Sequence, residues 1–176
     1  MAPLPVFVAQ LLWFVVVWFA VARLVVWPRT RALRPDAALA FWIAPQMFRV
    51  LGLGLLVENL SPGMPREFAV ATAAGDSLTA ALALTAFVGL LRGRSFGRPA
   101  AWACTLVGVT DLLIAFPHAV RTGALDHLAA QWYVPVVAGP IMVVAHGAAL
   151  ATLLQSRRTG ADAGREPMQA TPRSRR

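Results

Sequence analysis

Five long apolar stretches dominate the chain, and short segments containing Arg, Pro and Gly separate them. The apolar stretches cover about residues 5–27, 38–57, 68–91, 100–120 and 132–154. An α-helix rises about 1.5 Å per residue, so about 20 apolar residues cross the hydrocarbon core of a bilayer. The pattern therefore predicts an all-α integral membrane protein, in which a bundle of five transmembrane helices forms a single domain over residues 1–155.

The composition supports a membrane protein and excludes other classes. Hydrophobic residues make up 58% of the chain and charged residues 14%, whereas about 25% of a soluble domain is charged. The formal net charge is +8, but nucleic-acid binding needs a basic face on a folded soluble domain, so no nucleic-acid partner is expected. The only cysteine is Cys104, which excludes an intrachain disulfide and a multi-cysteine metal site. The expected partner is the lipid bilayer.

The basic residues are distributed unevenly between the connections. Three lie in residues 28–37, three in residues 92–99 and six after residue 155, twelve in all, against one in each of the other two connections. The positive-inside rule places the Arg-rich segments in the cytoplasm, so the N-terminus is outside and the C-terminus inside, as an odd number of spans requires. Residues 156–176 have too few apolar side chains to form a core and are predicted to be a disordered, Arg-rich cytoplasmic tail.

The basic residues also suggest a source. All 16 of them are Arg, and the chain is rich in Ala. We interpret this composition as that of a GC-rich bacterial genome. A multi-pass helical protein of such an organism is expected in the cytoplasmic (inner) membrane.

Small and polar side chains indicate which helices pack inside the bundle. In the third span they recur every three or four residues, a pattern that lets helix backbones approach closely in lipid. This stripe consists of Thr72, Gly75, Asp76, Thr79, Ala80 and Ala83. The fourth and fifth spans carry comparable stripes, so spans three, four and five are expected to pack together. The first span is bulky on every side and is expected to face lipid.

Prolines interrupt three of the spans. They are Pro45, Pro117, Pro135 and Pro140. A proline inside a helix leaves a carbonyl group without its donor and kinks the axis. Such kinks can shape a cavity, although proline is also simply more frequent in membrane helices.

Three charged residues are expected inside the membrane at one level. Arg49, Asp76 and Asp111 lie in spans two, three and four, each about 8–9 residues from the outer end, or roughly 12–14 Å deep. An ionisable side chain at such depth costs about 2.5–3.5 kcal/mol to insert, so these residues are expected to pair as a buried charge cluster. Two interpretations remain open: the cluster fixes the arrangement of the helices, or it shares a proton and binds or transports a ligand.

A polar path could extend from this cluster. Gln46 lies one turn from Arg49 on the same face of span two, His118 lies near the outer end of span four, and His146 lies deeper in span five. Histidines and carboxylates at different depths are typical of proton relays. The alternative is that each histidine is hydrogen-bonded to a neighbouring carbonyl group.

The sequence contains no recognisable motif for catalysis, a cofactor or a metal ion. Ser77 is not part of a Gly-x-Ser-x-Gly sequence, and His118 and His127 lack the spacing of metal ligands. We therefore expect no catalytic residue, no cofactor and no metal site. Whether the protein is an enzyme stays open at this point, with a non-enzymatic role favoured.

Two functions of different class fit these observations. The favoured one is a non-enzymatic accessory or assembly module, whose buried cluster stabilises the bundle or contacts a partner helix of another membrane protein or of a second copy. The alternative is a small transporter or proton-coupled permease that uses the same cluster. The sequence identifies no substrate for either.

One passage resembles a known family. Residues Phe48 to Phe116, with Phe48-Arg49-Val-Leu-Gly52 followed by an acidic residue in a small-residue helix, resemble the small bacterial DoxX-like membrane proteins. The resemblance covers less than half of the chain and includes no matching loop motif. It implies a small bacterial membrane protein and assigns no residue a role.

Overall fold

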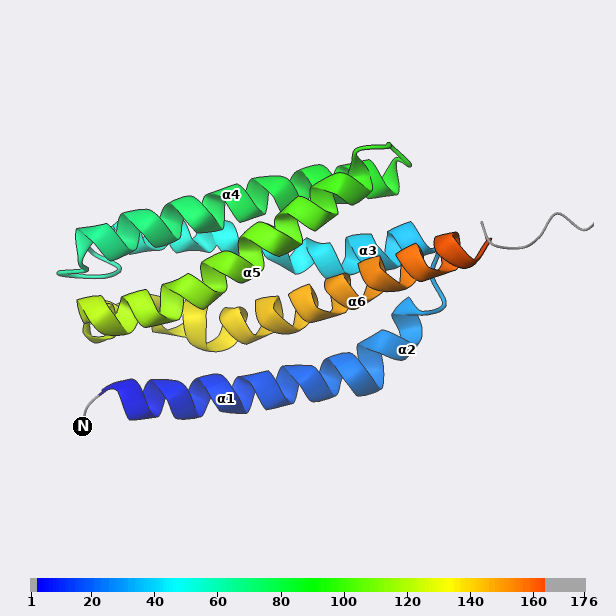
Figure 1. Cartoon of the computed structure of the whole chain (residues 1–176). Coiled ribbons are helices and arrows are strands. Elements are labelled where there is room, and N and C mark those ends of the chain that lie inside the picture. The colour runs from blue at the N-terminus through cyan, green and yellow to red at the C-terminus, as the bar shows by residue number, and fades with distance from the viewer. Residues whose placement is uncertain (1–2, 164–176) are drawn as a thin grey trace, which may run out of the picture.

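Every described element of the chain is a helix. The computed structural model describes residues 3–163, and no strand occurs among them (Figure 1). The elements in chain order are α1 (Pro3–Val21), η1 (Ala22–Val26), α2 (Trp27–Thr30), α3 (Pro35–Ile43), η2 (Ala44–Leu56), α4 (Arg66–Leu91), α5 (Gly97–Thr122), η3 (Ala124–His127), η4 (Ala129–Trp132), η5 (Val134–Ala138) and α6 (Gly139–Ala163). Of these, η1 and η5 are π-helices, and η2, η3 and η4 are 3-10 helices. Helix α6 includes the first residues of the predicted tail, and residues 164–176 lie outside the described part.

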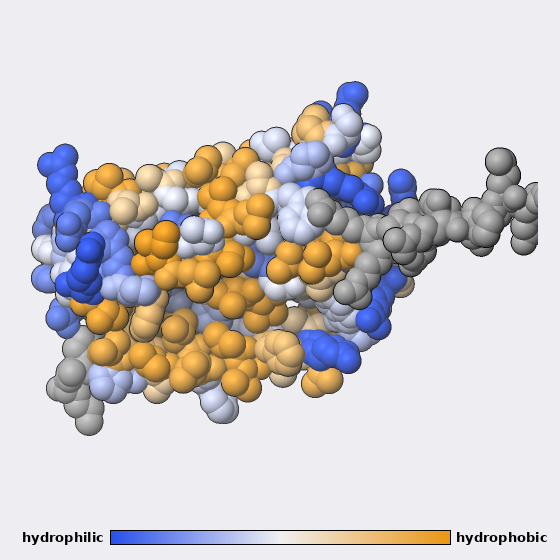
Figure 2. Space-filling view, viewed as in Figure 1, coloured by the Kyte–Doolittle hydropathy of each residue, from blue (hydrophilic) through white to orange (hydrophobic). Residues whose placement is uncertain are grey.

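Five continuous helical segments are long and apolar enough to cross a membrane. They are Leu4–Thr30, Pro35–Leu56, Arg66–Leu91, Gly97–Thr122 and Ala129–Gln155. They run side by side, so the connections gather at the two ends of the bundle (Figure 1). On the face seen in Figure 2, hydrophobic side chains dominate the middle of the surface and hydrophilic ones gather toward both ends. The prediction of an all-helical bundle with five such helices is confirmed.

Helix α1 lies at the edge of the bundle. Only 6% of the most apolar part of the first span is buried, against 39% in the second and fifth spans. Its one polar side chain before Arg23, Gln10, accepts a hydrogen bond from Nε1 of Trp132 at 2.8 Å. The ring of Phe7 also packs edge-on against Trp132, with 5.4 Å between the centroids. These contacts fasten α1 to the segment that precedes α6.

The second span changes its helical form half-way, which the sequence analysis did not predict. It begins as the α-helix α3 and continues as the 3-10 helix η2, although 3-10 helices longer than three or four residues are uncommon. In a 3-10 helix, side chains three residues apart lie above one another. The buried residues of η2 are Gln46, Arg49, Gly52 and Leu55, which have this spacing. The 3-10 form therefore turns one straight row of side chains toward the bundle.

Helix α4 packs against α3, η2 and α5, and α5 also packs against α6. The predicted association of spans three, four and five thus appears as two pairs, α4 with α5 and α5 with α6. The larger remaining contacts of α6 are with α3 and α1. The second span is therefore as central to the bundle as the third.

The buried side chains form two hydrophobic clusters. One, here called the alanine core, consists of Leu39, Ala40, Trp42, Ile43, Ala83, Ala86, Leu90, Ala101, Cys104, Ala145, Ala149 and Leu153. The other, here called the loop-side core, consists of Phe7, Leu55, Phe68, Ala69, Ala119, Ala124, Leu125, Leu128 and Val136. Helices α4 and α5 contribute residues to both cores. The predicted charged residues lie along the chain between the parts of these helices that build the two cores.

Candidate functional site: a buried Arg-Asp-Asp cluster beside a cavity

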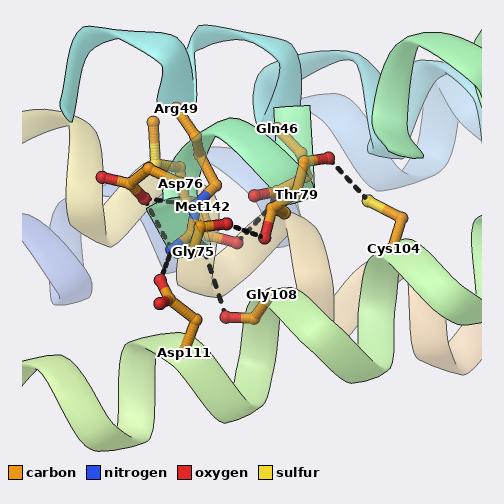
Figure 3. Close-up of polar contacts among 9 residues, drawn as sticks. All are labelled: Gln46, Arg49, Gly75, Asp76, Thr79, Cys104, Gly108, Asp111 and Met142. Carbon is orange, nitrogen blue, oxygen red and sulfur yellow. Dashed lines mark hydrogen bonds and ion pairs between the residues drawn. The ribbon is translucent and has the colours of Figure 1, made fainter. Parts of the chain in front are cut away.

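A single arginine connects three helices. From η2, Arg49 donates a hydrogen bond through Nε to Oδ1 of Asp76 on α4 at 2.7 Å. Its Nη1 donates to the backbone oxygen of Gly108 on α5 at 3.1 Å, and its Nη2 donates to Oδ2 of Asp111 on the same helix. Only 1% of the Arg49 side chain is exposed. The structure thus brings together the three charged residues that the sequence places at one depth (Figure 3).

Glycines make room for the polar side chains of the cluster. A Cβ atom at Gly52 would overlap the carboxylate of Asp76, and one at Gly75 would overlap the carboxylate of Asp111. A Cβ atom at Gly108 would likewise overlap the ring of His146. Each glycine lies on a different helix from the side chain it accommodates. The small residues therefore leave room for polar side chains of a neighbouring helix, in addition to letting helix backbones approach one another.

The two carboxylates are the part of the cluster that stays accessible. The side chains of Asp76 and Asp111 are 15% and 16% exposed. Within residues 3–163, no hydrogen bond is made to Oδ2 of Asp76 or Oδ1 of Asp111. With both carboxylates ionised, one guanidinium leaves a net charge of −1. The cluster can therefore offer hydrogen-bond acceptors and negative charge, while each nitrogen of its guanidinium group already donates a hydrogen bond.

A second set of polar contacts lies next to the cluster on the side of the alanine core. Gln46, 0% exposed, donates from Nε2 to the backbone oxygen of Met142 on α6 at 3.0 Å. Thr79 donates to the backbone oxygen of Gly75 at 2.8 Å, and the thiol of Cys104 lies 3.8 Å from the backbone oxygen of Thr79. Figure 3 shows these groups beside the ion pairs. They extend the polar centre to all four inner spans.

The two candidate histidines lie in different surroundings. His146 is 2% exposed, its ring packs over Gly108, and neither ring nitrogen has a hydrogen-bond partner within residues 3–163. His118 packs edge-on against Phe68 with 5.5 Å between ring centroids. In the described part of the chain, no hydrogen bond joins either imidazole to the cluster. His146 thus neighbours the cluster, whereas His118 lies against Phe68 of the loop-side core.

The described residues include no group of three or more His, Cys, Asp or Glu side chains that could hold a metal ion. The sequence analysis rejected His127 as a metal ligand. Its Nδ1 lies 3.1 Å from the backbone oxygen of Pro62. This contact joins the two connections at one end of the bundle. A second hydrogen bond joins the same two connections: the backbone nitrogen of Ala130 donates to the backbone oxygen of Leu60 at 3.2 Å.

A cavity of about 210 Å³ adjoins the cluster within the loop-side core. Arg49, Gly52, Asp76 and Asp111 line it, together with the rings of Phe7, Phe68 and Phe116. Leu125, Leu128 and Gln131, from the connection between α5 and α6, complete the wall. The cavity therefore combines apolar walls with two partly exposed carboxylates.

The chain matches one described protein family. The sequence pattern of that family, described as a domain of unknown function (DUF8737), matches residues 6–154. The chain belongs to this family. No curated protein and no solved structure matches the chain. The matched residues include the whole cluster and the cavity, but the family description gives no activity, and the resemblance to DoxX-like proteins adds no role for the site.

The sequence analysis located the charged residues of the site but few of the other residues around them. It named Gln46 and His146, which lie beside the cluster. It did not single out Gly108 as an acceptor or Gln131 as a cavity residue. Pro45 and Pro135 lie in the irregular helices η2 and η5, and Pro135 lines the cavity, whereas Pro117 and Pro140 lie in the α-helices α5 and α6.

Proposed function

We propose that the protein is a multi-pass protein of the bacterial inner membrane, with its N-terminus outside and its C-terminus in the cytoplasm. Six exposed arginines lie at or near the connections on one end of the bundle: Arg29, Arg31, Arg34, Arg92, Arg94 and Arg98. The opposite end carries two exposed arginines and three exposed acidic residues: Arg66, Arg121, Glu58, Glu67 and Asp126. The positive-inside rule assigns the arginine-rich end to the cytoplasm.

Reporter fusions test this orientation. A reporter active only in the cytoplasm should be active when fused after Arg34, Arg98 or Gln155, and inactive after Pro65 or Asp126. A reporter that is active only outside should give the reverse pattern. One reversed pair would contradict the five-span topology.

Within this membrane, we infer that the protein acts as a non-enzymatic accessory or assembly module. The observation that supports this role is the connection of η2, α4 and α5 by one buried arginine. Removing one partner of a buried ion pair costs about 3–5 kcal/mol in soluble proteins, because a charge is left without its counter-charge. The cluster is thus a means of fixing one arrangement of the helices. The partner in such an assembly is another membrane protein or a second copy of the chain.

One observation favours a second function, a small transporter or proton-coupled permease. Asp76 and Asp111 line the cavity, and ionisable groups that face an internal cavity in a membrane mark ion and substrate paths. In this function a carboxylate would take up and release a proton or a cation during each cycle.

Reconstitution distinguishes the two functions. The purified protein is placed in liposomes that contain a pH-sensitive dye, and a proton gradient is imposed with and without candidate substrates. A module gives the same dye response as empty liposomes and, in mild detergent, elutes as a complex of fixed stoichiometry. A transporter gives flux that Asp111→Asn abolishes while the variant stays folded. Flux of this kind would overturn the module assignment.

A further inference from the structure

The cluster presents hydrogen-bond acceptors to the cavity. Arg49 also lines the cavity, but its side chain is only 1% exposed, and each of its three side-chain nitrogens already donates a hydrogen bond, to Asp76, Gly108 or Asp111. The second oxygen of each carboxylate makes no hydrogen bond within residues 3–163. With both carboxylates ionised, a ligand that reaches this part of the cavity meets a net negative charge. An anionic ligand would meet these carboxylates and a guanidinium group that is already paired with them.

A second polar group points to a ligand from another part of the cavity wall. Gln131 lines the cavity and is 9% exposed, and its Oε1 is buried without a hydrogen-bond partner in the described part of the chain. Its amide group lies against Gly54 of η2, where an added Cβ atom would come within 2.5 Å of it. A buried polar atom that lacks a partner costs free energy. A bound donor would remove this cost.

The walls between these polar groups are mostly apolar and include three aromatic rings. Phe7, Phe68 and Phe116 line the cavity together with Leu55. Aromatic faces attract cations as well as apolar groups. An apolar cavity of about 150 Å³ in another protein holds benzene, so about 210 Å³ can hold one aromatic ring with a short side chain. Phe116 and Val143, which also line the cavity, are 40% and 46% exposed.

We infer that this cavity binds a small lipophilic amine in its protonated form. The ammonium group lies between the free oxygens of Asp76 and Asp111, and the apolar body lies among the phenylalanine rings. The Gln131 amide accepts a hydrogen bond from a donor on the ligand. The inference rests on the proposed function of the charge cluster and adds a ligand class to that function. A zwitterionic lipid headgroup fits less well, because its phosphate group would meet the carboxylates without a free cation.

Binding is tested with a pair of nearly isosteric probes. The full-length protein in detergent is titrated with 2-phenylethylamine, which is protonated at neutral pH, and with the neutral 2-phenylethanol. Isothermal calorimetry and the midpoint of thermal unfolding are recorded. A hydrogen bond to a charged group is worth more than a neutral one, so the amine should bind at least about tenfold more tightly than the alcohol.

A cavity-filling variant locates the binding site. Ala115 lines the cavity, and Ala115→Leu fills part of it while leaving every charge of the cluster in place. This variant should lose amine binding. Ala81→Leu makes the same change at an exposed position of α4 and should bind the amine as the wild type does. Should Ala115→Leu fail to fold, Thr72→Leu, at another residue that lines the cavity, is interpreted in the same way.

Two results would overturn the inference. Equal affinity for the amine and the alcohol would show that the carboxylates do not select the ligand. Unchanged amine binding in the folded cavity-filling variant would show that the probe binds elsewhere. Because these variants keep Arg49, Asp76 and Asp111, such a failure would leave the structural role of the cluster intact.

Discussion

The alanine core and the loop-side core are built on the same two helices, yet they pack differently. In the alanine core, six of the twelve buried residues are Ala, and regular α-helices surround them. The closest approach there is between the ends of α4 and α5, where a Cβ atom on Gly97 would come within 2.6 Å of the backbone nitrogen of Leu90. In the loop-side core, large side chains pack against three short irregular helices, and a cavity remains.

The difference shows how helix regularity controls packing in this bundle. Small residues repeated every three or four positions form a continuous groove only on a regular α-helix, and this groove lets two backbones meet. The 3-10 and π-helical segments η2, η3, η4 and η5 change their residue spacing from one to the next. They therefore cannot present one continuous groove. Their side chains leave space at the level of the charge cluster.

Among the packing contacts of the two cores, the largest effect is expected where two backbones touch. Gly97→Ala places a methyl group against the backbone of α4, which can yield only if the helices separate, so the free energy of unfolding should fall by about 3 kcal/mol. Gly147→Ala is the matched control, because an added Cβ atom there has nothing within 4 Å. The control should be neutral or stabilise the protein by up to about 1 kcal/mol. Denaturant unfolding in detergent measures both. Equal effects of the two variants would refute the close approach.

Enlarging an alanine should have a larger effect in the alanine core than at the cavity. Ala83 is 0% exposed in the alanine core, so Ala83→Leu should destabilise the protein by about 2 kcal/mol through overpacking. Ala115→Leu projects into the cavity and should change the stability by less than about 1 kcal/mol, in either direction. Thermal unfolding of both variants tests the contrast. A destabilisation of the same size in both would mean that the loop-side core is as tightly packed as the alanine core.

The smallest effect is expected at the arginine-rich end of the alanine core. Arg98 donates from Nε to Oδ1 of Asp36 at 2.8 Å, and the two side chains are 48% and 35% exposed. Exposed ion pairs contribute about 0–1 kcal/mol. Asp36→Asn should therefore lower the stability by no more than about 0.5 kcal/mol, and less at high salt. A larger loss would mean that this pair, and not only the packing of small residues, holds the two connections together.

The sequence was sufficient to predict the five long apolar helices, because these depend on local properties, and it named the three charged residues that meet in the structure. The length of a run of apolar residues shows whether a helix could cross a membrane. The cost of burying Arg49, Asp76 or Asp111 alone favours their pairing with one another. The 3-10 form of η2 had a weaker signal. Gln46, Arg49 and Gly52 are spaced by three, but a short row of this kind also fits one face of an α-helix.

The cavity could not be predicted in detail for a physical reason. Its walls come from residues far apart in the chain, such as Phe7, Phe68 and Gln131, and no local pattern joins them. Pro135 indicated irregular backbone near the start of span five. The amount of space left there depends on how η3, η4 and η5 fold back over the bundle.

The central claim is that Arg49 holds the second, third and fourth spans together by pairing with Asp76 and Asp111. Its most direct test compares thermal and denaturant unfolding of Arg49→Ala with that of the triple variant Arg49→Met, Asp76→Asn and Asp111→Asn. The single variant leaves two carboxylates without their counter-charge and should lose about 3–5 kcal/mol. The triple variant removes all the charges at once and should recover much of this loss despite its additional changes. A single variant as stable as the wild type, with a triple variant that shows only additive losses, would contradict the claim.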